Sequence, residues 1–297
     1  IVLFNSDIFN GREFAPLTGI EFHQMTGRAG RRGQDKIGFM LSVPGRFMDL
    51  NHVKKLLFRK PENIESRIRN DFSMVLNLLL SQTPDDIKAI FEKSLAAFQS
   101  HSKSGRQGGS LWDDFCRHLD FLKEEGFVDD HNRLTDNGRW ASKLRLDQPL
   151  LIAECLRRDV LPGTDEKLFA AVIAPFVYDG DQEAGVPEKK IPRKLRSASH
   201  RVAQAVKPLI GRMKTAGFAV NRQYFWPAYA IYTWAQGNSW DQIIRTTGLT
   251  DGDLAMLVLR TADNLRQITS LGDTHPDIAA VAARARECIL REPVVME

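Results

Sequence analysis

The sequence has few cysteines and no long hydrophobic run. Its three cysteines, Cys116, Cys155 and Cys288, are isolated and odd in number, whereas a disulfide framework or a zinc site needs paired spacing. The longest aliphatic stretches, such as LNLLL at 76–80, fall far short of the ~20 residues that a membrane-spanning helix needs. IVLFNSDIF carries no basic region of the kind that opens a secretory signal. These absences argue against a disulfide scaffold, a metal site and a membrane protein, and they predict reduced thiols in a cytoplasmic protein.

The overall composition is that of an ordinary globular protein. The chain has 297 residues, of which 43% are hydrophobic and 26% charged, as in typical folded domains. This length corresponds to two or three domains. The first residue is Ile rather than Met, which is typical of a processed or truncated polypeptide.

The positive charge is unevenly distributed. The whole chain has a net charge of +4, but the segment 188–222 contains ten basic residues and a single acid, Glu188. The basic residues are Lys189, Lys190, Arg193, Lys194, Arg196, Arg201, Lys207, Arg212, Lys214 and Arg222. Such a block is often a solvated helix face. Because acids are missing from it, the block also favours a polyanionic partner.

The order of predicted elements indicates a mainly α chain with a small α/β part at its start. Residues 1–48 combine two strand-like segments with one short helix. Residues 49–147 are mostly helix-like, with a linker at 101–110 that contains three glycines and three serines. Within them, FVDDHNRLTDNGRWA (127–141) predicts a two-stranded hairpin after a helix, as in a winged-helix module. Residues 148–297 are a series of helix-like segments without a fixed period, which predicts a helical bundle.

The stretch HQMTGRAGRRGQDKIG, residues 23–38, concentrates arginine and glycine. Glycine permits a close backbone approach to a ligand, and the arginine fork matches phosphate oxygens. On a helix, Gln24, Arg28 and Arg31 would share one face, because they lie at i, i+4 and i+7. This register favours a phosphate site, with Gly27 and Gly30 on the phosphate side. A flexible, solvated basic loop is the alternative. Salt bridges cannot be its main purpose, since Asp35 is the only acid in the stretch.

The segment QMTGRAGRRG resembles motif VI of superfamily-two helicases, in the form typical of the superkiller-type DExH family. The likeness continues on both sides, in FNGREFAPLTGIEFHQM and QDKIGFML, and then in DFSMVLNLLL and LTDNGRWASKL. The helical segments LDQPLLIAECLRRDVL and DLAMLVLRTADNLRQI, with HPDIAAVAARARECILREPVV, are similar to the DSHCT helical domain of that family. The resemblance therefore spans nearly the whole chain, in order.

The resemblance assigns a domain and a role to each part. Residues 1–48 would be the end of a second RecA-like domain, 49–147 a winged-helix region and 148–297 a DSHCT-like domain that guides a single strand. Arg31 would be the arginine finger, stabilising charge on the γ-phosphate, with Arg28 assisting and Gln24 positioning the phosphate or the attacking water. The implied enzyme is an ATP-dependent helicase, with RNA favoured as substrate and 3′ to 5′ movement.

Two helicase motifs are missing from the sequence. A phosphate loop of the form G-x-x-x-x-G-K-[S/T] and an acidic D-E-x-H/D motif for Mg²⁺ are both absent. We therefore expect ATP and Mg²⁺ to be held mainly by an N-terminal RecA-like motor domain, and no ATP hydrolysis from this chain alone. The chain also has Ile8-Phe9-Asn10-Gly11 where the family has K-F-D-G.

Two further segments are candidates for contact with single-stranded nucleic acid. In the predicted helix 251–269, Arg260, Asn264 and Gln267 form a polar face that would touch bases, although a solvated face explains the same pattern. Family members often carry an arginine where this chain has Met256. The block 188–222 would bind phosphates, through Lys189, Lys190, Arg193, Lys194 and Arg196 above all. The aromatic segment FWPAYAIYTW (225–234) could stack on bases, but its helical spacing is more typical of a core.

Two alternatives stay open. A DNA-repair helicase of the same architecture would contain the same segments. A non-catalytic nucleic-acid-binding or scaffold module would need no upstream motor, so that the sequence preceding Ile1 distinguishes it from a helicase.

Overall fold

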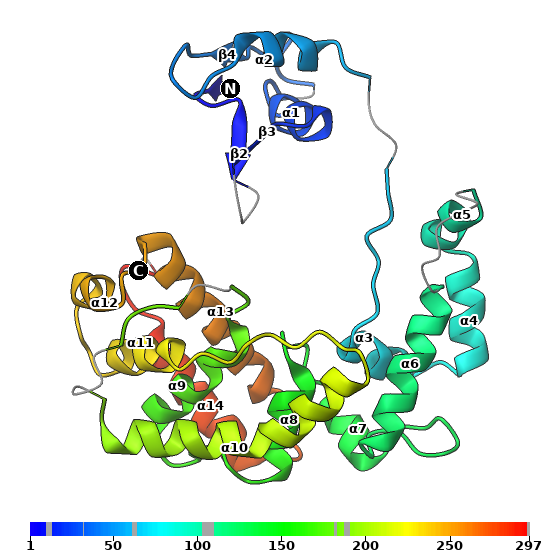
Figure 1. Cartoon of the computed structure of the whole chain (residues 1–297), viewed down its shortest axis with the longest axis vertical. Helices are drawn as coiled ribbons and strands as arrows, with labels where there is room; N and C mark the ends of the chain where they lie inside the picture. The colour runs from blue at the N-terminus through cyan, green and yellow to red at the C-terminus, as the bar shows by residue number, and fades with distance from the viewer. Residues whose placement is uncertain are drawn as a thin grey trace. The chain divides into compact units, whose positions relative to one another are not determined.

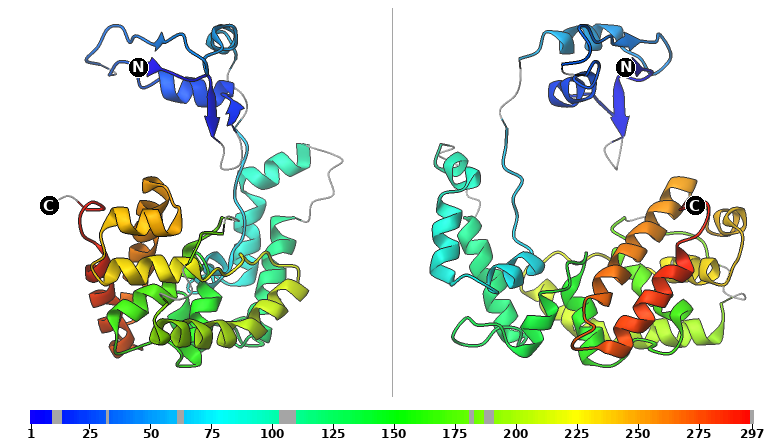
Figure 2. Two further views of the ribbon diagram at one scale, coloured as in Figure 1. Left: turned by 60° about the vertical axis from the view of Figure 1, so that its left-hand side comes forward. Right: turned by 180° about the vertical axis from the view of Figure 1, so that it is seen from behind.

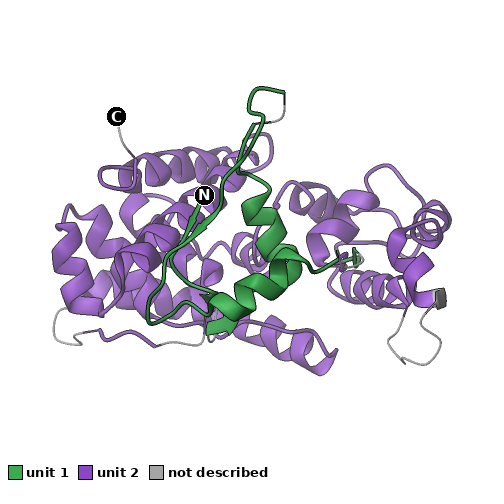
Figure 3. Cartoon of the chain, turned by 90° about the horizontal axis from the view of Figure 1, so that it is seen from above, with its two compact units in different colours: residues 1–66 green, residues 67–297 purple. Residues whose placement is uncertain are grey.

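A computed structural model gives the fold of the chain, which divides into two compact units, residues 1–66 and 67–297 (Figure 3). The structure describes residues 1–9, 14–31, 33–60, 64–102, 110–180, 183–186 and 191–295. In the described residues no helix combines the length and the apolarity needed to cross a bilayer. Cys116, Cys155 and Cys288 are separate thiols.

The described residues of the first unit form four short strands and two helices. These are β1 (Val2–Leu3), β2 (Asp7–Phe9), β3 (Phe14–Pro16), α1 (Gly19–Thr26), β4 (Leu41–Ser42) and α2 (Leu50–Leu57) (Figure 1). β1 pairs with β4 in parallel, and β2 pairs with β3 in antiparallel register. The α/β character predicted for the start of the chain is thus present.

The core of the first unit extends past the predicted boundary at residue 48. Phe22 of α1 is fully buried and packs with Leu3 and Leu17, and with Val53 and Leu56 of α2. Val53 and Leu56 lie at i and i+3, and therefore on one face of α2. The first compact unit accordingly includes α2 and ends at Ser66. The assignment of the three predicted regions to named domains stays a prediction.

The second unit is built of helices, and their bounds are as follows. They are α3 (Phe72–Leu78), α4 (Pro84–Glu92), α5 (Leu95–Ser102), α6 (Leu111–Glu124), α7 (Asp136–Ala141), α8 (Pro149–Arg157), α9 (Glu166–Val177), α10 (Arg193–Thr215), α11 (Trp226–Ala235), α12 (Trp240–Thr247), α13 (Asp251–Thr269) and α14 (Pro276–Ile289). The predicted mainly α fold is confirmed. One continuous hydrophobic core runs from Phe72 in α3 to Ile289 in α14.

Helix α9 is the centre of this core. It packs against α11, α13 and α14, and α13 and α14 lie side by side (Figure 2). The aromatic segment 225–234 forms the start and body of α11, where Trp226, Tyr229, Tyr232 and Trp234 are all buried. The Nε1 of Trp234 donates a hydrogen bond to the Ile289 carbonyl at 2.7 Å. The interpretation of this aromatic segment as part of the core is therefore correct. The alternative, that these rings stack on bases, is wrong because they are buried.

The predicted hairpin at 127–141 is right for its first half, where backbone hydrogen bonds join Asp129 to Arg133 and Thr135 to Phe127, and wrong for its second half. Only one antiparallel bridge forms there, between Val128 and Leu134. Thr135 then caps α7, accepting a hydrogen bond from the Gly138 N–H. The second half of the segment is therefore a helix. A cap residue followed by Asp in the first turn favours a helix N-terminus, and that local signal outweighs the strand pattern. The winged-helix assignment stays a prediction.

A close backbone contact fixes α7 against the chain that precedes it. A Cβ placed on Gly138 would lie 2.0 Å from the carbonyl oxygen of Phe127. A side chain at this position would therefore push α7 away from the hairpin. Gly211 in α10 is the opposite case, because a Cβ there would meet nothing within 4 Å.

Alanine substitution of these two glycines should have effects of opposite sign. We expect Gly138→Ala to destabilise the second unit by more than about 1 kcal/mol, since backbone must move to relieve the clash. Gly211→Ala should stabilise it by up to about 1 kcal/mol, since alanine is the better helix former. Urea unfolding followed by tryptophan fluorescence measures both, because all five tryptophans lie in the second unit. Equal effects of the two substitutions would contradict this packing.

Candidate nucleotide and nucleic-acid sites

Helix α1 carries the first residues of the arginine–glycine stretch. Thr18 and Glu21 form a capping box at its start, in which the Thr18 N–H donates to Glu21 Oε2 at 2.9 Å. Hydrogen bonds from the backbone and side chain of Thr18 lower the pKa of the Glu21 carboxyl. Phe22 turns into the core, which leaves Gln24 exposed.

The helix ends too early to place the three predicted residues on one face. It stops at Thr26, with Gly27 as its C-cap, and Gly30 adopts a φ of 83°. This left-handed conformation is accessible to glycine and takes the chain out of the helical path. Arg28 and Arg31 therefore lie beyond the helix, in a turn. The predicted helical register of Gln24, Arg28 and Arg31 is wrong, although their role in a phosphate site stays a prediction.

A second glycine lets the turn fold back on the chain. A Cβ on Gly38 would lie 2.1 Å from the Ala29 carbonyl oxygen, so that only glycine fits where the segment before β4 passes the turn. At least this glycine of the stretch serves a close approach within the chain, rather than to a ligand.

Arg31 is engaged by the one acid of the stretch. Its backbone N–H and its Nε both donate to Asp35 Oδ2, at 2.8 Å and 3.2 Å. The guanidinium hydrogen bond, together with the backbone one, lowers the pKa of the Asp35 carboxyl. The single acid of the stretch thus serves Arg31, and within the described residues it leaves Arg28 without an ion pair. Both side chains are exposed, so a stronger anion can compete for the guanidinium.

The other two residues predicted for the phosphate site, Gln24 and Arg28, differ from Arg31 in their contacts. Gln24 and Arg28 are exposed, and within the described residues neither side chain has a hydrogen bond or an ion pair. Arg32 lies outside the described residues. Of the two described arginines of the stretch, Arg28 is therefore the one whose guanidinium has no partner in the described residues.

Helix α13 holds the residues predicted to touch bases. One of these residues, Arg260, already forms ion pairs with two carboxylates. Arg260 makes ion pairs with Asp147 Oδ1 at 2.8 Å and with Asp179 Oδ1 at 3.0 Å. Burial lowers the pKa of the Arg260 guanidinium, but hydrogen bonds to the two aspartates outweigh burial and raise that pKa above its ordinary value. Arg260 therefore keeps its positive charge, and the carboxylates of Asp147 and Asp179 partly neutralise that charge.

Asn264 belongs to the same network. It is only 3% exposed, and its Nδ2 donates to Asp147 Oδ2 and to the Arg260 carbonyl, both at 3.0 Å. The alternative of a solvated face is thus wrong for Asn264, which has no free face toward solvent. Gln267, one turn further on, is half-buried. Met256, near the start of the helix, is 57% exposed.

Sequence reasoning missed Asp147 and Asp179. They stand in the segments before α8 and after α9, and more than 80 residues separate each from Arg260. No local pattern marks such partners. The one available signal was the need of a half-buried arginine for an acceptor.

Helix α10 displays most of the described part of the basic block, and Arg222, which follows the helix, pairs with Glu183 at 3.9 Å. Leu195, Ala198, Val202, Val206, Leu209 and Met213 face the core at 3- and 4-residue spacing. The opposite face exposes Arg193, Lys194, Arg196, Arg201, Lys207, Arg212 and Lys214. Lys189 and Lys190 lie outside the described residues.

Acids from other elements neutralise part of this face. Arg212 forms a two-pronged ion pair with the buried Glu125, at 2.5 Å and 2.8 Å. Lys194 pairs with Asp165, the N-cap of α9, at 3.0 Å. The expectation that the block is unneutralised is thus wrong for these two residues. The cationic surface that is left centres on Arg193, Arg201 and Lys207.

Comparison with known proteins places the second unit in a family. The DSHCT (NUC185) domain family matches residues 131–297, which is more than half of the chain. Superkiller complex protein 2 of Mus musculus is 29% identical over 143 residues, covering 48% of this chain and 11% of the mouse protein. Antiviral helicase SKI2 of Saccharomyces cerevisiae is 22% identical over 198 residues, covering 63% and 15%. ATP-dependent RNA helicase mtr4 of Schizosaccharomyces pombe is 35% identical over 79 residues, covering 27% and 7%.

The helical second unit thus contains a DSHCT domain, over residues 131–297. The chain belongs to the DSHCT domain family, and its resemblance to the C-terminal part of a superkiller-type helicase is confirmed. The matched region spans about a tenth of the length of these curated relatives.

Removing the Arg31 guanidinium should raise the pKa of Asp35. A pair that lowers a carboxyl pKa is present at neutral pH and is lost as the pH falls through the lowered folded value. We expect Arg31→Ala to move the Asp35 titration toward the ordinary carboxyl value, but not fully, because the backbone N–H still donates. NMR titration of the Asp35 carboxyl carbon measures the change. Asp86, which Thr83 holds, should not move. An unchanged Asp35 titration would show that the pair is absent in solution.

Removing the Asp147 carboxylate should destabilise the second unit. Asp147→Ala takes an acceptor from both Arg260 and Asn264, and a half-buried polar group without its partner costs about 1–3 kcal/mol. Asp263→Ala is the matched control, because its ion pair with Arg266 is exposed on both sides and should contribute at most about 1 kcal/mol. The free energy of unfolding in urea measures both. A control as costly as Asp147→Ala would refute the structural role of the network.

Proposed function

We propose that this chain is the C-terminal portion of an ATP-dependent RNA helicase that moves 3′ to 5′. In this proposal the second unit guides a single strand, and the first unit supplies the arginine finger to an ATP site. The observation that carries the proposal is the presence in one chain, in order, of the QMTGRAGRRG segment and a DSHCT domain. Two of the similar proteins are named as helicases, and one of them as an RNA helicase, which supports RNA over DNA.

The ATP part of the proposal rests on the first unit. Arg28 has an exposed guanidinium without a partner in the described residues, which suits it to a phosphate oxygen. Arg31 would have to exchange Asp35 for the γ-phosphate, an exchange that its exposure permits. Within the described residues no group of three acidic, histidine or cysteine side chains could hold a metal ion. Because the sequence has neither a phosphate loop nor an acidic D-E-x-H/D motif, we assign Mg²⁺ and most contacts to ATP to an N-terminal RecA-like motor domain.

The nucleic-acid part rests on α10 and α13. Contacts from α10 would go to phosphates, through cations such as Arg193 and Arg196, and would be independent of sequence. Contacts from α13 to bases would fall to Arg260 and Gln267, since Asn264 is buried. Arg260 could make such a contact only by leaving Asp179, which is 64% exposed.

Binding of this chain to single-stranded RNA should be weak and strongly salt-dependent. The logarithm of the affinity for a single strand falls with the logarithm of salt concentration by about 0.7 for each phosphate contact. We expect the double variant Arg193→Ala, Arg201→Ala to lower this slope by roughly one, with no preference among RNA sequences. Fluorescence anisotropy of labelled oligonucleotides at several salt concentrations measures it. Arg139→Ala, which removes an exposed cation from α7, is the control. A salt dependence with a slope near zero for the wild-type chain would show that it makes no phosphate contacts.

The ATPase part has its own test. The purified chain should show no ATP hydrolysis. In the protein that includes the motor domain, Arg31→Ala should lower kcat by about 10³-fold or more, as removal of an arginine finger does. Arg31→Lys should not restore it, because a lysine lacks the planar fork. Full activity of Arg31→Ala would remove Arg31 from the site, and robust hydrolysis by this chain alone would overturn the whole assignment.

A further inference from the structure

The two carboxylates that hold Arg260 of α13 differ in how firmly they are fixed. The terminal nitrogens of the guanidinium are divided between them, with Nη2 at 2.8 Å from Asp147 and Nη1 at 3.0 Å from Asp179. Asp147 also accepts from Asn264 Nδ2 at 3.0 Å, so that two side chains of α13 hold it. Asp179 is 64% exposed. Asp147 therefore orients the guanidinium, whereas Asp179 is the partner that an incoming anion can replace.

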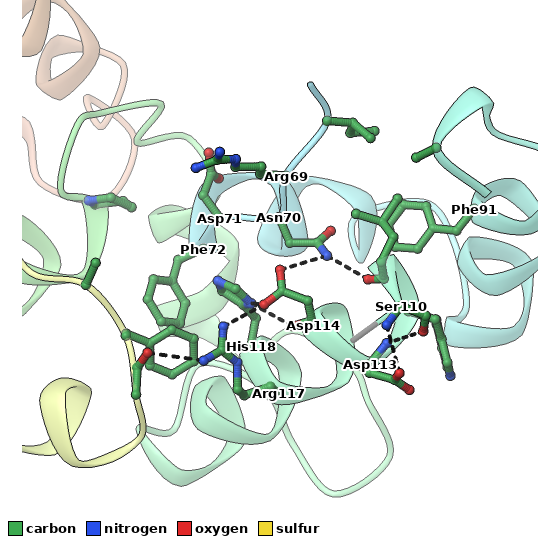
Figure 4. A pocket seen from close by; sticks show the side chains of 18 of the residues that line it. Arg69, Asn70, Asp71, Phe72, Phe91, Ser110, Asp113, Asp114, Arg117 and His118 are labelled. Carbon is green, nitrogen blue, oxygen red and sulfur yellow. Dashed lines mark hydrogen bonds and ion pairs between the residues drawn. The ribbon is translucent and has the colours of Figure 1, made fainter. Parts of the chain in front are cut away.

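Asp147 lines the large cleft of the second unit, where carboxylates serve to hold the fold together. Asp114 lines the same cleft. It accepts from Arg117 at 2.6 Å and from Asn70 at 3.2 Å, and Figure 4 shows these side chains directed toward one another. Asp179 is different, because it pairs with a single side chain, that of Arg260, among the described residues. Its loss would leave the networks of the cleft intact.

A second acid, Glu183, follows Asp179 closely in the chain and faces a second cation. Its Oε2 lies 3.9 Å from Arg222 Nη2, and both side chains are 70% exposed. Arg222 belongs to the basic block 188–222. The segment between α9 and α10 thus places one carboxylate against a cation of α13 and another against a cation of the basic block.

Neighbouring residues anchor these two acids to the helical bundle. Next to the first acid, the Tyr178 ring lies edge-on to the ring of Trp226 at the start of α11, with the centroids 4.6 Å apart. A Cβ on Gly180 would lie 2.5 Å from the Tyr178 hydroxyl oxygen, so that glycine lets the chain pass close over this ring. Next to the second acid, Ala184 packs against the hydrophobic core. The two carboxylates are therefore in position before any strand arrives.

A tethered carboxylate competes with the phosphates of an incoming strand. Both groups offer anionic oxygens to a guanidinium. Because the carboxylate belongs to the same chain as the arginine, its effective concentration is roughly millimolar. An exposed ion pair is nevertheless weak enough to be replaced. A strand therefore binds these cations less tightly than it would if the acids were absent.

We propose that Asp179 and Glu183 form an autoinhibitory acid pair, which occupies Arg260 and Arg222 in place of RNA phosphates and so weakens the binding of single-stranded RNA. The inference rests on the proposed function, in which the second unit guides a single strand. When a phosphate displaces Asp179, it meets a guanidinium that Asp147 still holds in its orientation. The acid pair thus sets how tightly the chain holds a strand, without changing which cations hold it.

Neutralising the acid pair should strengthen RNA binding. We expect Asp179→Asn to raise the affinity of the intact chain for a labelled poly-uridine strand by about threefold, within the range of an exposed ion pair. The salt dependence should steepen by about 0.7, the contribution of one more phosphate contact. Adding Glu183→Gln should raise the affinity further. Asp136→Asn is the matched control, because Asp136 is also an exposed acid paired with an arginine, and it should have a clearly smaller effect. Fluorescence anisotropy at several salt concentrations measures the affinities, and circular dichroism checks the fold of each variant.

Arg260 supplies a second readout. In an Arg260→Gln background, Asp179→Asn should no longer strengthen binding, because the cation that it releases is missing. The inference is overturned if Asp179→Asn binds RNA no more tightly than the wild type or than Asp136→Asn, or if its gain survives in a folded Arg260→Gln chain. Such a result in a chain that still binds RNA leaves the proposed function standing. A lack of RNA binding by the wild type and by every variant overturns both.

Discussion

A guanidinium that leaves bulk water must keep its hydrogen-bond acceptors, and this constraint shapes the second unit. Arg260 of α13 meets it with Asp147 and Asp179. The buried Glu125 carboxylate has the matching need for a donor and meets it with the exposed Arg212 of α10. Each acid comes from a different element, so that the ion pairs join helices that are far apart in the sequence. Asp147 also accepts from Asn264, which makes it the point where α13 is fixed to the start of α8. The apolar core brings these helices together, and the carboxylates decide which cations stay available to a partner.

The same constraint governs how the chain could act in a helicase. Arg31 and Arg260, two of the cations assigned to phosphate or base contact, are each held by aspartate in the structure. A nucleic-acid or nucleotide phosphate would therefore compete with a carboxylate instead of meeting a free charge, and this exchange moderates affinity. Arg28, Arg193 and Arg201 carry no such cost within the described residues. We therefore expect Arg28, Arg193 and Arg201 to attract a polyanion first. Arg31 and Arg260 would then exchange their aspartate partners for its phosphates.

Local patterns in the sequence predicted much of the fold but little of the geometry of the candidate sites. The mainly α content and the burial of the aromatic segment in α11 follow from periodicity, and cap residues explain where α4 and α6 begin. The second half of the predicted hairpin at 127–141 failed because Thr135 and Asp136 start a helix. The shared face of Gln24, Arg28 and Arg31 failed because α1 ends at Thr26, before both arginines, and Gly30 then leaves the helical conformation. The partners Asp147, Asp179 and Glu125 could not be predicted, since tertiary contacts alone bring them to their arginines.

The central claim is that Arg31 acts on a nucleotide held by a neighbouring motor domain. The most direct measurement is a structure of the protein with that domain, bound to single-stranded RNA and to ADP with a phosphate transition-state mimic. The account predicts that the Arg31 guanidinium has left Asp35 and donates to the mimic, with Arg28 at the same group. An Arg31 still paired with Asp35, and out of reach of the nucleotide, would contradict it.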